Sequence, residues 1–342
     1  QTMLSNTTGD NNTAVGNETL KSNTSGYSNV GVGNSALNAT TSGFQNAACG
    51  MLALKSNTTG TRNNAFGFYA LASATTASYN CAFGTWALDA VTTGTRNVAM
   101  GYAALTDGTS NDNTAIGHEA AMAISTGYSN TAVGSYALYT ATTDNNNTAV
   151  GFEALKNSTA DSTTAIGSRA LKENTSGAEN CAVGNNALKE NTTGSNNTAC
   201  GTNALASSTT ANQSTAVGKG AGFNVTTGEG NTLLGYNCGQ NITTGAVNTA
   251  IGRDTLRTAT GSSYNTAVGY HALYNAGGNG YNTALGYYAG FDVTTGENNL
   301  LLGYQSGQSA SPSGAITTGS HNVVLGNNSI TNCYIKVDWT VT

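Results

Sequence analysis

Apolar and polar residues follow one short pattern along this chain, and the pattern returns with little change. It reads Asn-Thr-Ala-Val-Gly-x-x-Ala-Leu, then a polar link, then Thr-Thr-Gly and two or three residues back to the next Asn. We call the glycine that ends Asn-Thr-Ala-Val-Gly the closing glycine. It occurs 19 times, from Gly16 to Gly326; of the 18 intervals fifteen are 17 residues, two are 16 and the last is 23. Such a period predicts a solenoid with one turn per repeat.

The residues just before each closing glycine predict a short strand. The last of them is apolar in all 19 repeats, for example Val15, Phe66 and Met100, and the one before it is Ala in 15 repeats and never polar. Because successive residues of a strand point to opposite faces, both faces of this strand are apolar. Each face therefore needs a cover.

The repeat itself offers only one cover. It is the Ala-Leu pair of the same turn, such as Ala36-Leu37 or Ala70-Leu71. A turn of 17 residues has nothing left for the other face, so we expect a second copy of the chain to cover the alanine face. The prediction is an obligate homo-oligomer packed along that face.

Two further positions have a structural interpretation. Asn opens the strand in 17 of 19 repeats, and stacked amides can form a hydrogen-bonded ladder. The Thr-Thr-Gly corner has Gly seven residues before the closing glycine in 12 repeats, such as Gly9 and Gly26, which predicts a turn with positive φ. The predicted ladder includes Asn12, Asn29, Asn46, Asn130, Asn147, Asn265 and Asn282.

Composition supports an all-β chain and excludes several functions. Only 8% of residues are charged, 44 are Gly and one is Pro. Gly, Asn and Thr are poor helix formers, whereas disorder favours proline and high charge. A net charge of −5 gives no basic surface for nucleic acid, and the sequence has no apolar stretch long enough for a membrane helix.

The predicted architecture is thus an all-β parallel β-solenoid of about 19 turns, assembled as a homotrimeric rod on the order of 90 Å long at about 4.8 Å per turn. Residues 1–326 would form the repetitive shaft. Residues 327–342 would form a C-terminal capping segment, because Cys333 to Val341 alternate apolar and polar residues as a half-buried strand does.

The repeats resemble two families. Asn-Thr-Ala-Val-Gly-x-x-Ala-Leu units are similar to the head repeats of trimeric autotransporter adhesins, which implies a left-handed parallel β-roll in each of three chains. The repeats also resemble phage tail fibres and tail spikes that end in a self-cleaving intramolecular chaperone. Those carry blocks like Tyr288-Ala289-Gly290 to Leu302-Gly303, and a strand ending in Trp-Thr-Val-Thr like residues 339–342. This second resemblance implies that Thr342 is the C-terminus left by chaperone cleavage.

Candidate chemistry is sparse. The three histidines lack partners at metal or catalytic spacing, and Glu173 and Glu190, which share a slot one repeat apart, follow lysines on a polar corner. We therefore expect no catalytic residues, no metal and no cofactor.

Five cysteines fall in repeat slots that we take to be mostly inward, where they would be free thiols acting as small hydrophobes. Aromatic residues that follow the closing glycines either pack between turns or contact glycans; the candidates are Tyr236, Tyr270, Tyr287, Tyr288 and Tyr304.

The expected function is a structural fibre of a phage virion that attaches to the host cell surface, its partners being itself, host polysaccharide or another receptor, and other virion proteins. Rigidity and multivalent weak contacts would provide the mechanism. The alternative is the head of a bacterial trimeric surface adhesin. An ice-binding solenoid needs a regular Thr array, which Val30, Ala47 and Asn64 interrupt.

Overall fold

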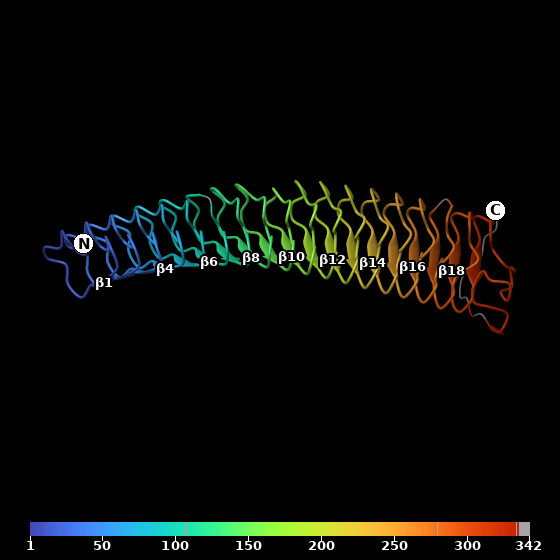
Figure 1. Ribbon diagram of the computed structural model, residues 1–342. Coiled ribbons are helices and arrows are strands. Elements are labelled where there is room, and N and C mark those ends of the chain that lie inside the picture. Colours follow the sequence, from blue (N-terminus) through green and yellow to red (C-terminus); the bar gives the residue numbers. More distant parts are fainter. Residues whose placement is uncertain (107, 279, 333, 335–342) are drawn as a thin grey trace. The chain divides into compact units, whose positions relative to one another are not determined.

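The computed structural model describes residues 1–106, 108–278, 280–332 and 334 (Figure 1). It comprises two compact units, Gln1–Thr202 and Asn203–Thr342. Each unit is a parallel β-solenoid with one three-residue strand per turn, and the described residues contain no helix. The all-β solenoid predicted from the repeat is confirmed.

Every strand ends at the residue before a closing glycine, as the repeat predicts, and Figure 1 shows the strands as short arrows, one per turn. The first unit contains β1 (Thr13–Val15), β2 (Val30–Val32), β3 (Ala47–Cys49), β4 (Asn64–Phe66), β5 (Cys81–Phe83), β6 (Val98–Met100), β7 (Thr114–Ile116), β8 (Thr131–Val133), β9 (Thr148–Val150), β10 (Thr164–Ile166), β11 (Cys181–Val183) and β12 (Thr198–Cys200). The second contains β13 (Thr215–Val217), β14 (Thr232–Leu234), β15 (Thr249–Ile251), β16 (Thr266–Val268), β17 (Thr283–Leu285), β18 (Leu300–Leu302) and β19 (Val323–Leu325).

Within each unit, consecutive strands pair in parallel and strictly in register. In the first unit Ala65 of β4 lies opposite Ala82 of β5, and in the second Ala250 of β15 lies opposite Ala267 of β16. Each position of the repeat therefore forms a column of equivalent side chains. The predicted capping strand from Cys333 to Val341 lies almost entirely outside the described residues.

The core corrects the sequence-based assignment of the two strand faces. The middle residue of each strand points inward: Ala65 and Ala82 are fully buried, as are the turn leucines Leu71 and Leu88. The Leu of the turn covers the alanine face, so no second chain is needed there. The face that the turn leaves open is the opposite one, and the prediction of an interface along the alanines is wrong.

Glycine is required at two positions for different reasons. The closing glycine Gly50 has φ of +140°, and a Cβ there would lie 2.3 Å from the carbonyl oxygen of Gly67 on the next turn. The corner glycine Gly43 does not have the positive φ that we predicted. A Cβ on it would lie 2.6 Å from the carbonyl oxygen of Gly60, so close stacking of successive corners excludes a side chain.

Candidate functional site

The open face of the strands is an uncharged, partly apolar surface, which we call the strand face. It consists of the first and third residue of each strand, which point outward. Val15 is 58% exposed and Met100 43% exposed. In the first unit the third-residue column continues through Val32, Cys49, Phe66, Phe83, Ile116, Val133, Val150, Ile166, Val183 and Cys200, and the second unit has Val217, Leu234, Ile251, Val268, Leu285, Leu302 and Leu325. A contiguous apolar surface of this kind marks an interaction site.

The asparagines that precede the strands form hydrogen-bonded ladders beside this face. The backbone N–H of Asn46 donates to Oδ1 of Asn29 at 3.0 Å, and Nδ2 of Asn46 donates to the carbonyl of Gly60 at 2.9 Å. In the second unit, Nδ2 of Asn265 donates to Oδ1 of Asn248 at 3.0 Å. These buried amides satisfy the corner carbonyls of the next turn, so the ladder is structural. The same bonding involves Asn12, Asn130, Asn147 and Asn282.

The five candidate tyrosines lie on the second unit, and four of them form one cluster. Tyr270 and Tyr287 stack with centroids 5.3 Å apart, and Tyr287 and Tyr304 stack at 5.6 Å. Tyr288 packs against Tyr287 at 4.6 Å. Tyr236 joins them through Arg253, whose guanidinium lies 5.6 Å from the Tyr236 ring and 5.7 Å from the Tyr270 ring. Because the rings cover one another's faces, they present mainly their edges and hydroxyls to a ligand.

An ion-pair network around one buried carboxylate lies next to this cluster. Asp254 is almost fully buried, and its carboxylate contacts Arg253 at 3.1 Å, Arg257 at 3.2 Å and Nε2 of His271 at 3.6 Å. Burial lowers the pKa of His271, and the Asp254 carboxylate opposes this effect only in part. The network holds the ring of His271 against Tyr270, with centroids 4.0 Å apart. The sequence analysis missed Asp254. The basic side chains around it lie partly on its own turn and partly on the next, and only the stacking of the turns brings them together.

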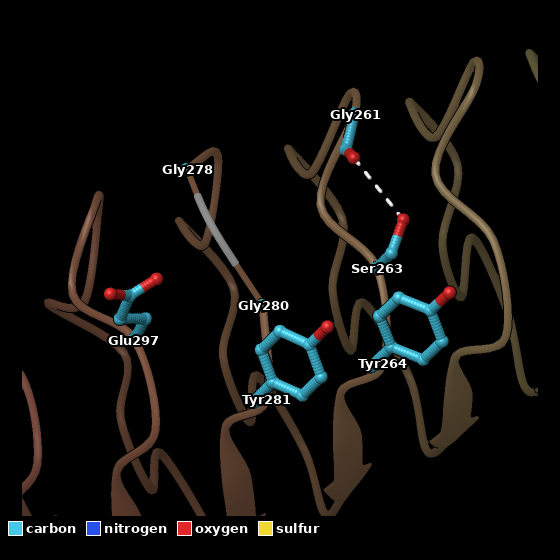
Figure 2. Close-up of a pocket in the computed structure, with 7 residues that line it drawn as sticks. All are labelled: Gly261, Ser263, Tyr264, Gly278, Gly280, Tyr281 and Glu297. Atoms are coloured by element: carbon cyan, nitrogen blue, oxygen red, sulfur yellow. Dashed lines mark hydrogen bonds between the residues drawn. The ribbon is translucent and has the colours of Figure 1, made fainter.

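A hollow of about 390 Å³ opens on the second unit between successive corners (Figure 2). Tyr264 and Tyr281 line it with parallel rings 5.0 Å apart, and Figure 2 shows their hydroxyls pointing the same way, with Glu297 on the following turn. The hollow exists because Gly278 and Gly280 provide no side chains. Residues 277–280 read Gly-Gly-Asn-Gly where most turns have a Thr-Thr-Gly corner, and this sequence feature could have predicted the hollow.

The acidic pair and the cysteines have plain structural roles. Glu173 lies 3.4 Å from Lys172, and Glu190 lies 2.6 Å from Lys189, so each carboxylate is paired with a lysine. The described cysteines are free thiols, but Cys49 and Cys200 are exposed on the strand face rather than inward as predicted. Only Cys238, of those described, is buried, and burial raises the pKa of its thiol to about 12. The predicted processing site Thr342 lies outside the described residues.

Comparison with known proteins does not extend these observations. No family model matches the chain, and neither the curated proteins nor the solved structures include a match. The described part of the chain contains no helix that could cross a bilayer. The surfaces of the chain itself are therefore the basis for inferring its function.

Proposed function

We propose that the protein is a homotrimeric structural fibre of a phage virion that attaches to glycans on the host cell surface. The observation that carries this proposal is the strand face, an uncharged and partly apolar column repeated on every turn of each solenoid unit. Exposed apolar surface on this scale favours assembly over a free monomer.

A second copy of the chain is the partner that fits this face best. Its side chains recur once per strand spacing, about 4.8 Å. A partner that buries them all must present side chains with the same repeat, and another copy of this chain does so. The assembly would therefore use the face opposite to the alanines, with the cores of the three chains kept separate.

Assembly leaves other columns available for binding. The aromatic cluster around Tyr270 and Tyr287 lies on the turn after the closing glycine, not on the strand face. Columns repeated along three chains would add weak saccharide contacts through effective concentration. This supports attachment, and a glycan is a suitable ligand because the tyrosine hydroxyls that the cluster presents can form hydrogen bonds with saccharide hydroxyls.

The oligomeric state can be tested directly by sedimentation of the full chain. We expect a mass three times the 34.4 kDa of one chain. Replacing Ile116, Val133 and Val150 together with lysine puts charge on the strand face, and this variant should dissociate. A control with Tyr128→Lys, an exposed residue outside the strands that form that face, should remain assembled. A monomeric wild type, or a strand-face variant that stays trimeric, would contradict the proposal.

Attachment is tested by binding labelled wild-type protein to candidate host cells before and after enzymatic removal of their surface polysaccharide. Binding that requires the polysaccharide supports the proposal, and binding that survives its removal contradicts a glycan receptor.

The coding sequence of the gene distinguishes a phage fibre from a bacterial adhesin. A coding sequence that continues into a heptad stalk and membrane strands would assign the chain to a bacterial adhesin instead of a virion.

A further inference from the structure

The first unit contains a notch that differs from the rest of its surface. It has a volume of about 350 Å³, and Trp86, Asp89, Tyr102, Ala103 and Glu119 are among the residues that line it. The notch lies on the turns that follow β5, β6 and β7. Its lining residues all follow closing glycines, so none of them belongs to the strand face.

The notch arises from one small residue in a column of large ones. Trp86, Ala103 and Glu119 each lie two residues after a closing glycine on successive turns. The same slot holds Tyr69 one turn before and Tyr136 one turn after. Two turns span about 9.6 Å, so Ala103 leaves a gap between Trp86 and Glu119 that one pyranose ring, lying against an aromatic face, can fill.

Its lining combines exposed aromatic surface with an acceptor. Trp86 is 37% exposed and Tyr102 43% exposed, and their rings meet edge to face at 5.3 Å. The ring of His118 stacks on Tyr102 at 5.2 Å, so the aromatic face on offer is that of Trp86. The Glu119 side chain is 21% exposed, and no lysine or arginine among the described residues pairs with it; its one ion-pair contact there is Nε2 of His118 at 3.8 Å. Its carboxylate oxygens can therefore accept hydrogen bonds from a ligand.

These groups match a neutral sugar better than an acidic one. The apolar face of a pyranose packs on aromatic rings, and adjacent hydroxyls donate to a carboxylate. The Glu119 carboxylate gives the notch a negative potential that opposes uronic or sialic acids. The hollow of Figure 2 is less suitable, since the rings of Tyr264 and Tyr281 stack on each other, whereas the Trp86 ring meets Phe68 and Tyr102 at 57° and 66°.

We propose that this notch binds one pyranose ring of a neutral glycan, with the ring against Trp86 and its hydroxyls donating to Glu119. The inference rests on the proposed function and specifies one receptor-binding subsite and its ligand class. Repetition of the subsite on each chain of an oligomer would raise a weak single-site affinity to a useful avidity.

The test is saturation-transfer NMR on the full chain, with methyl glycosides of glucose, galactose, mannose and N-acetylglucosamine as probes and methyl glucuronoside as the acidic comparison. At least one neutral glycoside should bind with millimolar affinity and the glucuronoside more weakly.

Ala103→Leu fills the notch and should weaken binding by about tenfold or more. It should fold, since Leu52 occupies the same slot with φ of 63° where Ala103 has 50°. Glu119→Gln, which keeps the shape, should reduce the preference for neutral over acidic sugar.

The matched control is Asn186→Leu, the same slot on a turn that does not line the notch. It should bind like wild type. The inference is overturned if Ala103→Leu binds equally well, if the glucuronoside binds as tightly as the neutral sugars, or if none of the four neutral glycosides binds. Adsorption to host cells distinguishes the two levels. Loss of the notch with polysaccharide-dependent adsorption intact would reject this subsite but leave the fibre function standing.

Discussion

Turns that keep the repeat and turns that depart from it build the same core in opposite ways. In a regular turn of the second unit, the strand contributes a small residue, Ala267, and the turn contributes a large one, Leu273; both are fully buried. In the departing turns the strand contributes Leu301, and the two turn positions that flank it are Gly290 and Gly307.

In the departing turns the large residue has moved from the turn to the strand, and the two glycines leave just enough room for it. We call this the exchange of large and small residues. A Cβ on Gly290 would lie 2.7 Å from Cδ1 of Leu301, and one on Gly307 would lie 3.2 Å from its Cδ2. Leu233 has the same relation to Gly222 and Gly239, with distances of 2.8 Å to each. The fold therefore specifies the volume of each layer and leaves open which side of the layer provides it, as is known for other tightly packed cores.

The comparison is tested most strongly by removing the exchanged leucine. Leu301→Ala should destabilise the chain by about 2–5 kcal/mol, because glycines on both sides cannot fill the cavity. Leu273→Ala in a regular turn should cost a similar amount. Denaturant unfolding of the two variants measures both costs, and a Leu301→Ala variant as stable as wild type would show that Leu301 does not fill the core.

The reciprocal change tests the match itself. Gly290→Leu should destabilise by about 1–3 kcal/mol through overpacking against Leu301. Its backbone conformation is not the obstacle, since Leu52 adopts the φ of 63° that Gly290 has. In the double variant with Leu301→Ala, the new leucine should recover part of the loss. A double-mutant cycle measures this coupling, and additive effects would refute the exchange.

A smaller effect is expected where the asparagine ladder is interrupted. The backbone N–H of Thr163 donates to Oδ1 of Asn147 at 2.9 Å, but the Thr163 hydroxyl donates to the carbonyl of Asp161 at 3.1 Å instead of extending the ladder. Thr163→Asn restores the side chain found in regular turns and should stabilise the chain by about 0.5–1.5 kcal/mol. A lower thermal midpoint in this variant would mean that the interruption is itself favourable.

The smallest effect is expected at the carboxylate of Glu153 and depends on pH. Burial tends to raise the pKa of Glu153, but hydrogen bonds from Lys156 at 3.0 Å and Arg169 at 3.2 Å outweigh it and lower the pKa overall. The ionised carboxylate therefore stabilises the fold above its ordinary pKa of 4.5, and this contribution is lost as the pH falls through the lowered value. Melting temperature should fall less steeply with acidification in Glu153→Gln than in wild type. Parallel curves would contradict this.

The sequence predicts the strands well, because the closing glycine marks the end of every one. It does not show which face of a strand is inside. Period-two alternation separates Ala65 from Phe66 but is symmetrical, and the larger residue is the exposed one because Leu71 already fills the core. The corner glycines were interpreted through φ, whereas the approach of the next corner requires them. The notch around Ala103 was missed because the slot that Ala103 occupies varies widely along the chain, from Gly220 to Tyr69, so one small residue in it does not stand out.

The in-register stacking also governs how such a gene can change in length. Recombination between two regular repeats adds or removes whole turns and recreates the same contacts at the junction. A junction that separates Leu301 from Gly290 or Gly307 would instead place two large side chains, or none, in one layer. Exchanged turns are thus inherited as a block, while the regular repeats between them are free to vary in number.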